Sequence, residues 1–110
     1  MEGKAVEHHY IIVFEGVQSI KEAHARIKAG MHFPNYYGEN WDAFWDCATD
    51  LSGRPLYIEV HGIEQMQKIN AKETQIFLET LKDLKHVWHD RYADITRIVL
   101  VTGDVRTEIR

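Results

Sequence analysis

The chain has 110 residues, of which 45% are hydrophobic and 27% charged, which suits one globular domain with a single core across residues 1–110. Its formal net charge of −4 and pI near 5.9 argue against direct binding of nucleic acid, because affinity for phosphates comes from clustered lysine and arginine. An acidic protein of this kind is better suited to a basic partner.

The sequence also predicts a cytoplasmic protein without membrane contact. Its first fifteen residues lack the basic segment, apolar run and cleavage site of a secretory signal, and the longest apolar run, residues 10–14, is too short to span a bilayer. The single cysteine, Cys47, cannot form an internal disulfide, which agrees with a reducing compartment.

The first predicted strand covers residues 8–14, which are rich in β-branched and aromatic side chains. Ser19 and Glu22 form a capping-box pattern, in which each side chain accepts a hydrogen bond from the other residue's backbone N–H. This pattern predicts a helix from about Ile20 to Ala29, with Gly30 placed to stop it.

An irregular connection follows, marked by Pro34 and Gly38. Asn40 is a suitable cap for a second helix over residues 41–51. Farther along, Asn70 and Glu73 predict the start of a long amphipathic helix, whose apolar positions are Phe77, Leu81, Leu84 and Trp88. The other predicted elements are a strand at residues 56–60, a short helix at 63–69 and a strand at 94–103.

Strands that alternate with helices in this way are typical of parallel strands joined by helical crossovers. The predicted fold class is therefore α/β, with a small three-stranded parallel sheet packed with about four helices.

Residues 41–51 separate into two faces when placed on a helix. One face is apolar, with Cys47 at its margin, and comprises Trp41, Phe44, Ala48 and Leu51. Asp42, Asp46 and Thr49 lie on the opposite face, and Trp45 lies at the boundary. A core accounts for Phe44 and Trp41, but it does not account for Trp45 beside two carboxylates.

Each acid has a simple structural explanation when taken alone. Asp42 lies in the first helical turn, where the helix dipole favours a negative charge, and Asp46 could be an ordinary solvated surface charge. Together with Tyr36, Tyr37 and Trp45, however, the two acids predict one patch in which rings exclude water around the carboxylates. Such a patch is typical of a protein interface.

The segment FPNYYGENWDAFWDCATD, with SIKEAHARIK before it and PLYIEV and ADITRIVLV after it, resembles the barstar family of intracellular inhibitors of the ribonuclease barnase. The resemblance covers roughly residues 10–101, and YYGEN, DA and WDC in fixed register are specific to it. It implies a barstar-like domain that binds a small, basic, extracellular-type ribonuclease one to one. It implies neither enzymatic activity nor a cofactor or metal.

The resemblance also implies roles for individual residues. Asp46 would replace an RNA phosphate opposite the enzyme's catalytic arginine and histidine groups, and Asp42 would meet a neighbouring basic group. Tyr36 would pack on the active-site histidine, and Trp45 would help to seal the contact. The other residues implied to contact the partner are Tyr37, Gly38, Asn40 and, on the last helix, Asp83.

The sequence departs from the family pattern at the edge of this surface. The family pattern has leucine at the position of Trp41, an aromatic residue at Leu51 and a second acid at Val87, and the HVWHDRY connection is longer here. Because such residues tune selectivity, a barstar-like immunity or regulatory module that binds a partner other than a ribonuclease is the main alternative.

Two other classes of function have some support in the residues. Cys47 with a histidine could form a nucleophilic pair, and Asp42 with Asp46 could act as paired carboxylates, but a cysteine near an apolar face more often packs as a small hydrophobe. The seven histidines invite a metal site, especially His86 and His89. Solvated histidines are the simpler interpretation, because no cysteine joins them.

Overall fold

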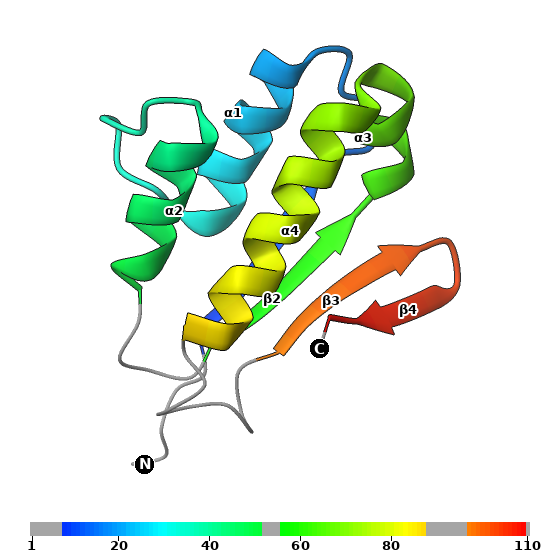
Figure 1. Cartoon of the computed structure of the whole chain (residues 1–110). Helices are drawn as coiled ribbons and strands as arrows, with labels where there is room; N and C mark the ends of the chain where they lie inside the picture. The colour runs from blue at the N-terminus through cyan, green and yellow to red at the C-terminus, as the bar shows by residue number, and fades with distance from the viewer. Residues whose placement is uncertain (1–7, 52–55, 88–96, 110) are drawn as a thin grey trace.

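The computed structural model describes residues 8–51, 56–87 and 97–109. Its elements, in chain order, are β1 (His8–Val13), α1 (Ile20–Met31), α2 (Trp41–Thr49), β2 (Leu56–His61), α3 (Ile63–Ile69), α4 (Ala71–Val87), β3 (Arg97–Thr102) and β4 (Val105–Glu108). Strands and helices alternate until β3, which confirms the predicted α/β class (Figure 1).

The sheet has four strands in the order β1-β2-β3-β4, so the prediction of three was wrong. β1, β2 and β3 are parallel, as predicted, and β4 pairs antiparallel with β3 through a hairpin. Gly103 occupies the turn with φ 59°, a conformation that glycine adopts without a steric penalty. All four residues of β4 are exposed, so the strand has no apolar alternation by which the sequence could reveal it.

The core lies between the sheet and the helices that cover one of its faces (Figure 1). Alternate strand residues point into it, and Ile12, Ile58 and Ile98 are fully buried. The predicted apolar positions of α4 that the structure describes, Phe77, Leu81 and Leu84, are also fully buried. Trp88 lies outside the described residues.

The predicted capping box of α1 forms only in part. Ser19 Oγ accepts a hydrogen bond from the backbone N–H of Glu22 at 3.0 Å, as predicted. The Glu22 carboxylate, however, accepts from the N–H of Gln18 at 2.9 Å. One free N–H group at the start of the helix is therefore satisfied as expected, and the second bond is shifted by one residue.

Gly30 does not stop α1, contrary to the prediction, because the helix continues to Met31 and ends on His32 in a left-handed conformation. Gly30 serves packing instead. A Cβ atom at this position would lie 2.3 Å from the carbonyl oxygen of Ile11, so α1 can approach β1 this closely only where the side chain is absent.

The caps of α2 and α4 are as predicted. Asn40 Oδ1 accepts from the N–H of Ala43 at 2.7 Å, and Asn70 Oδ1 accepts from the N–H of Glu73 at 3.0 Å. These caps fix where the two helices begin, and α2 and α4 then pack side by side (Figure 1).

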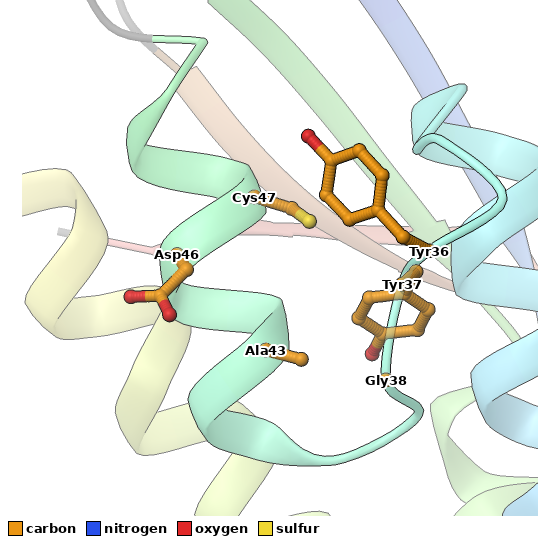
Figure 2. Close-up of a pocket in the computed structure, with 6 residues that line it drawn as sticks. All are labelled: Tyr36, Tyr37, Gly38, Ala43, Asp46 and Cys47. Carbon is orange, nitrogen blue, oxygen red and sulfur yellow. The ribbon is translucent and has the colours of Figure 1, made fainter.

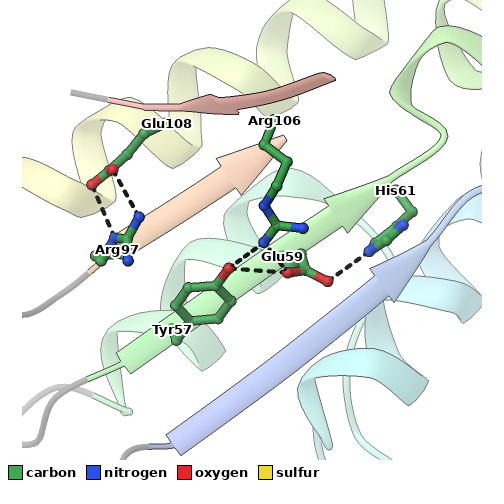
Figure 3. Close-up of polar contacts among 6 residues, drawn as sticks. All are labelled: Tyr57, Glu59, His61, Arg97, Arg106 and Glu108. Atoms are coloured by element: carbon green, nitrogen blue, oxygen red, sulfur yellow. Dashed lines mark hydrogen bonds and ion pairs between the residues drawn. The ribbon is translucent and has the colours of Figure 1, made fainter. Parts of the chain in front are cut away.

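The opposite face of the sheet has a polar network centred on Glu59, a side chain that is only 13% exposed (Figure 3). Its carboxylate accepts from Arg106 at 2.5 Å and from the Tyr57 hydroxyl at 3.0 Å, and it lies 2.7 Å from His61 Nε2. The hydrogen bonds from His61 and Arg106 lower the pKa of Glu59 to about 2. Glu59 is therefore ionised at neutral pH, and Arg106 connects β4 to β2 across the sheet.

Candidate protein-binding site

The loop of residues 34–40 and the helix α2 that follows it form the candidate site (Figure 1). The loop opens with a turn in which the N–H of Tyr37 donates to the Pro34 carbonyl at 3.0 Å. Glu39 then adopts φ 57°, and the Asn40 side chain both donates to the Gly38 carbonyl and caps α2. The turn and the cap fix the path of the loop beside the helix.

A pocket of about 220 Å³ lies between the loop and α2 (Figure 2). Its lining residues are Tyr36, Tyr37, Gly38, Ala43, Asp46 and Cys47. Ala43 and Cys47 are one helical turn apart and point from α2 toward the two tyrosine rings. The small side chains of Ala43 and Cys47 leave room for the pocket, and the tyrosines form its opposite wall.

Tyr36 and Tyr37 are neighbours in the chain but lie in opposite environments. Tyr36 is 80% exposed, whereas Tyr37 is 5% exposed and belongs to the core. The Tyr37 hydroxyl lies 2.7 Å from Nδ1 of the buried residue His24. The ring of Tyr36 is thus presented to solvent, while the ring of Tyr37 is a fixed part of the pocket wall.

The predicted acids are exposed and lie one turn apart on α2, at Asp42 and Asp46. Asp46 borders the pocket, but its carboxylate points away from the two tyrosine rings (Figure 2). No lysine or arginine occurs in residues 29–53, so nothing in this segment neutralises the two carboxylates. This part of the surface therefore attracts positive charge.

The two tryptophans of α2 differ in their surroundings. Trp45 is half-buried and packs against the core, so the core accounts for it in part, contrary to the sequence interpretation. Trp41 also packs on the core, as predicted, and its indole N–H donates to the Glu73 carboxylate at 2.7 Å. This bond fixes α2 to α4, and sequence reasoning missed it because the two residues are distant in the chain.

The structure thus brings four of the predicted residues, Tyr36, Tyr37, Gly38 and Asp46, around one pocket. Asn40, Asp42 and Trp45 lie on the same loop and helix. Asp83 is exposed on the neighbouring helix α4 and is not one of the residues that line the pocket. Of the altered edge positions, Leu51 is half-buried against the core, and Val87 is the last residue of α4.

Cys47 is buried rather than marginal, and sequence reasoning did not place it or Ala43 in a pocket wall. Burial raises the pKa of the Cys47 thiol, and the negative charges of Asp50 and Asp46 raise it further. The thiol is therefore held protonated at neutral pH, which is unfavourable for a nucleophile. Two small residues four positions apart, Ala43 and Cys47, lie on one face of α2, and this spacing could have indicated the pocket.

Two structural features that the alternative classes of site would require are absent from the described residues. Within residues 8–51, 56–87 and 97–109, no cluster of three or more His, Cys, Asp or Glu side chains is arranged to hold a metal ion. Across the same ranges, no helix combines the length and apolar character needed to cross a bilayer.

Two comparisons with known proteins give matches over most of the chain. The family model described as "Barstar (barnase inhibitor)" matches residues 7–100, which include the loop and α2. A relative from Bacillus subtilis (strain 168), named "Putative ribonuclease inhibitor YrdF", is 28% identical over 83 residues. That alignment covers 74% of this chain and 91% of the relative.

Proposed function

We propose that this chain, which belongs to the barstar family, inhibits a small basic ribonuclease by covering the enzyme's active site with α2 and the loop before it. The family is one of barnase inhibitors, and the relative named above carries a ribonuclease-inhibitor name. Occlusion requires no chemistry by the inhibitor. We further propose a one-to-one complex formed in the cytoplasm.

The observation that carries this proposal is the combination of an exposed ring, an apolar pocket and an exposed carboxylate at one place. Tyr36, the pocket and Asp46 are contiguous, and the surrounding segment has no lysine or arginine. The active site of a ribonuclease must concentrate positive charge to hold RNA, so it would attract this surface at long range.

Each proposed residue would act through its position. Asp46 would take the place of an RNA phosphate and accept charge-assisted hydrogen bonds from arginine or histidine groups of the enzyme. The pocket, on the other side of α2 from this carboxylate, would receive a second, apolar side chain of the enzyme, and Tyr36 would cover that side chain with its exposed ring. Asp42 would engage a second basic group, because it lies one turn away on the same helix.

The remaining proposed residues would support or extend this contact. Trp45 would help to exclude water at the edge, and Asp83 would add negative charge from α4. Tyr37, Gly38 and Asn40 would hold the loop in its binding conformation. A Cβ atom at Gly38 would lie 3.4 Å from the Ala43 side chain, so a larger residue there would narrow the pocket.

The test is a titration of the protein into barnase while RNA cleavage is followed. We expect stoichiometric inhibition by the wild type. The Asp46→Ala variant should bind at least about 2 kcal/mol more weakly, as expected of a central interface residue, with an unchanged free energy of unfolding.

A matched control is Asp104→Ala, which removes an exposed acid in the β3–β4 turn. It changes the net charge equally, so it separates the local role of Asp46 from general electrostatic attraction. Equal effects of the two variants would contradict the proposed role of Asp46. Absence of inhibition by the wild type would favour a partner other than this ribonuclease.

A further inference from the structure

The buried histidine of α1 is not used by the proposed inhibitory contact, yet it touches the wall of the pocket. His24 is 3% exposed, and its Nδ1 atom lies 2.7 Å from the Tyr37 hydroxyl. On its other side, its ring centroid lies 4.4 Å from that of Trp41. His24 is therefore enclosed between the loop and α2, the two segments that form the pocket.

Both members of the hydrogen bond are held in their neutral forms. Burial lowers the pKa of His24, although the negative charges of Glu39 and Glu73 act in the opposite direction. Burial likewise raises the pKa of the Tyr37 hydroxyl, with smaller contributions from Cys47 and Glu39. A neutral His24 with its proton on Nε2 can accept from the Tyr37 hydroxyl, which gives that buried O–H group an acceptor.

Protonation of His24 would remove this acceptor. Nδ1 would then donate instead, and the buried Tyr37 proton would lose its partner, which is costly in a dry environment. The charged groups that face the imidazole are Glu39 from the loop and Glu73 from α4, and Trp41 faces it from α2. The two acids only partly offset the cost of a buried cation, so outward movement of Tyr37 would relieve it.

We propose that His24 is a positioning residue that holds Tyr37 in the pocket wall, and that its protonation releases Tyr37, opens the pocket and weakens partner binding. The part that concerns the partner rests on the proposed function, whereas the opening of the pocket does not. The predicted window lies below pH 6.5, the ordinary pKa that His24 would regain in the open form.

The chain contains its own reporter of this opening. Cys47 is its only cysteine, is buried and lines the same pocket as Tyr37. Its labelling by a small aromatic disulfide reagent can be followed without any partner. His24→Asn is the matched variant, because the Asn Oδ1 atom can take the position of Nδ1 and accept from Tyr37 but does not titrate.

The labelling rate of the wild type, divided by that of His24→Asn at the same pH, should be constant above about pH 7. Because one pH unit below the open-form pKa corresponds to as much as a tenfold change in opening, the ratio should rise at least about threefold by about pH 5.5. The free energy of unfolding, measured at each pH, allows labelling through global unfolding to be subtracted. A ratio that stays flat would overturn the proposal.

Two further variants keep the test decisive. His61→Gln, on the opposite face of the sheet, should follow the wild type at every pH, and a lost pH dependence there would argue against His24 as its source. Tyr37→Phe lacks the hydroxyl and should label faster than the wild type at neutral pH, with little further rise on acidification. If His24→Asn does not fold, Tyr37→Phe serves as the reference variant in its place. A pH dependence of Cys47 labelling in Tyr37→Phe equal to that of the wild type would overturn the proposal.

The effect of His24 on partner binding is tested with barnase as the probe. The affinity of the wild type, divided by that of His24→Asn, should fall at least about threefold from about pH 7 to about pH 5.5. Titration of groups on barnase affects both proteins equally and therefore does not change this ratio. Absence of binding by both proteins would count against the proposed function and leave the labelling result standing. A pH-dependent labelling ratio with an unchanged affinity ratio would overturn the link between pocket opening and binding.

Discussion

On the helix-covered side of the sheet, the buried polar groups are neutral and hydrogen-bonded, whereas on the opposite face an ionised carboxylate, Glu59, is paired with Arg106. His24 and Thr74 are the buried polar residues among those described, and each has a hydrogen-bond partner. Glu59, by contrast, lies between Arg106, Tyr57 and His61 (Figure 3). The first region should therefore be sensitive to side-chain volume and to protonation of His24, and the second to protonation of Glu59 at lower pH.

The largest expected effect on the covered side comes from a cavity at Phe44. Its ring is fully buried. The centroid of this ring lies 5.6 Å from that of Phe77 and 5.9 Å from that of Phe33. Phe44→Ala should lower the free energy of unfolding by roughly 3–5 kcal/mol, measured by urea denaturation. Phe44→Leu leaves a smaller cavity and should lose less, so equal losses would show that volume is not the controlling quantity.

The next effect belongs to the opposite face and depends on pH. Because folding lowers the pKa of Glu59 from 4.5 to about 2, its contribution to stability is fully present above pH 4.5 and is lost as the pH falls toward 2. The loss should be on the order of 2 kcal/mol, because solvent around the exposed Arg106 screens part of the interaction. Urea denaturation of the wild type and Glu59→Gln across this range should show a much flatter acid dependence in the variant, and parallel curves would rule out this role.

A smaller effect is expected where α1 meets β1. In Gly30→Ala, the gain in helix propensity of about 1 kcal/mol opposes the overlap between the new methyl group and the Ile11 carbonyl. Overlap with backbone cannot be relieved by a side-chain rotation, so we expect a net loss of about 1–3 kcal/mol in urea denaturation. Ala25→Gly, at an exposed position of the same helix, measures the propensity alone. A stabilised Gly30→Ala protein would mean that α1 and β1 can separate without cost.

The smallest effect on stability is expected at the candidate site. Tyr36→Ala should change the free energy of unfolding by no more than about 0.5 kcal/mol, because the ring is 80% exposed. The same variant should nevertheless weaken binding to barnase by about 1 kcal/mol or more, measured by inhibition of RNA cleavage. A protein destabilised like Phe44→Ala would show that Tyr36 belongs to the core.

Some elements of the fold could be predicted from the sequence, and others could not. Buried strands and the long helix follow from regular apolar spacing, so the positions of β2 and α4 in the sequence could be predicted accurately. The role of Gly30 depends on a contact with another element, and β4 has no exposed-to-buried alternation. Local patterns could reveal neither of them.

The same limit applies to the site. Its acids and aromatic residues could be located because they cluster in one segment, but the opposite placements of Tyr36 and Tyr37 could not. Tyr37 turns inward toward His24, thirteen residues earlier in the chain. Which of two adjacent rings faces the core is thus decided by a nonlocal partner, and the part of each residue in binding stays a prediction.

Strand β4 has a consequence for how this protein should be shortened. The family match ends at residue 100, before β4 begins at Val105. A chain cut at that boundary would keep Glu59 but lose Arg106, and the backbone N–H and C=O groups of β3 would become the open edge of the sheet. The present edge strand, β4, is short and carries Arg106 and Glu108, whereas β3 is longer and mostly apolar, so as an edge it would template intermolecular strand pairing and the shortened chain should aggregate more readily.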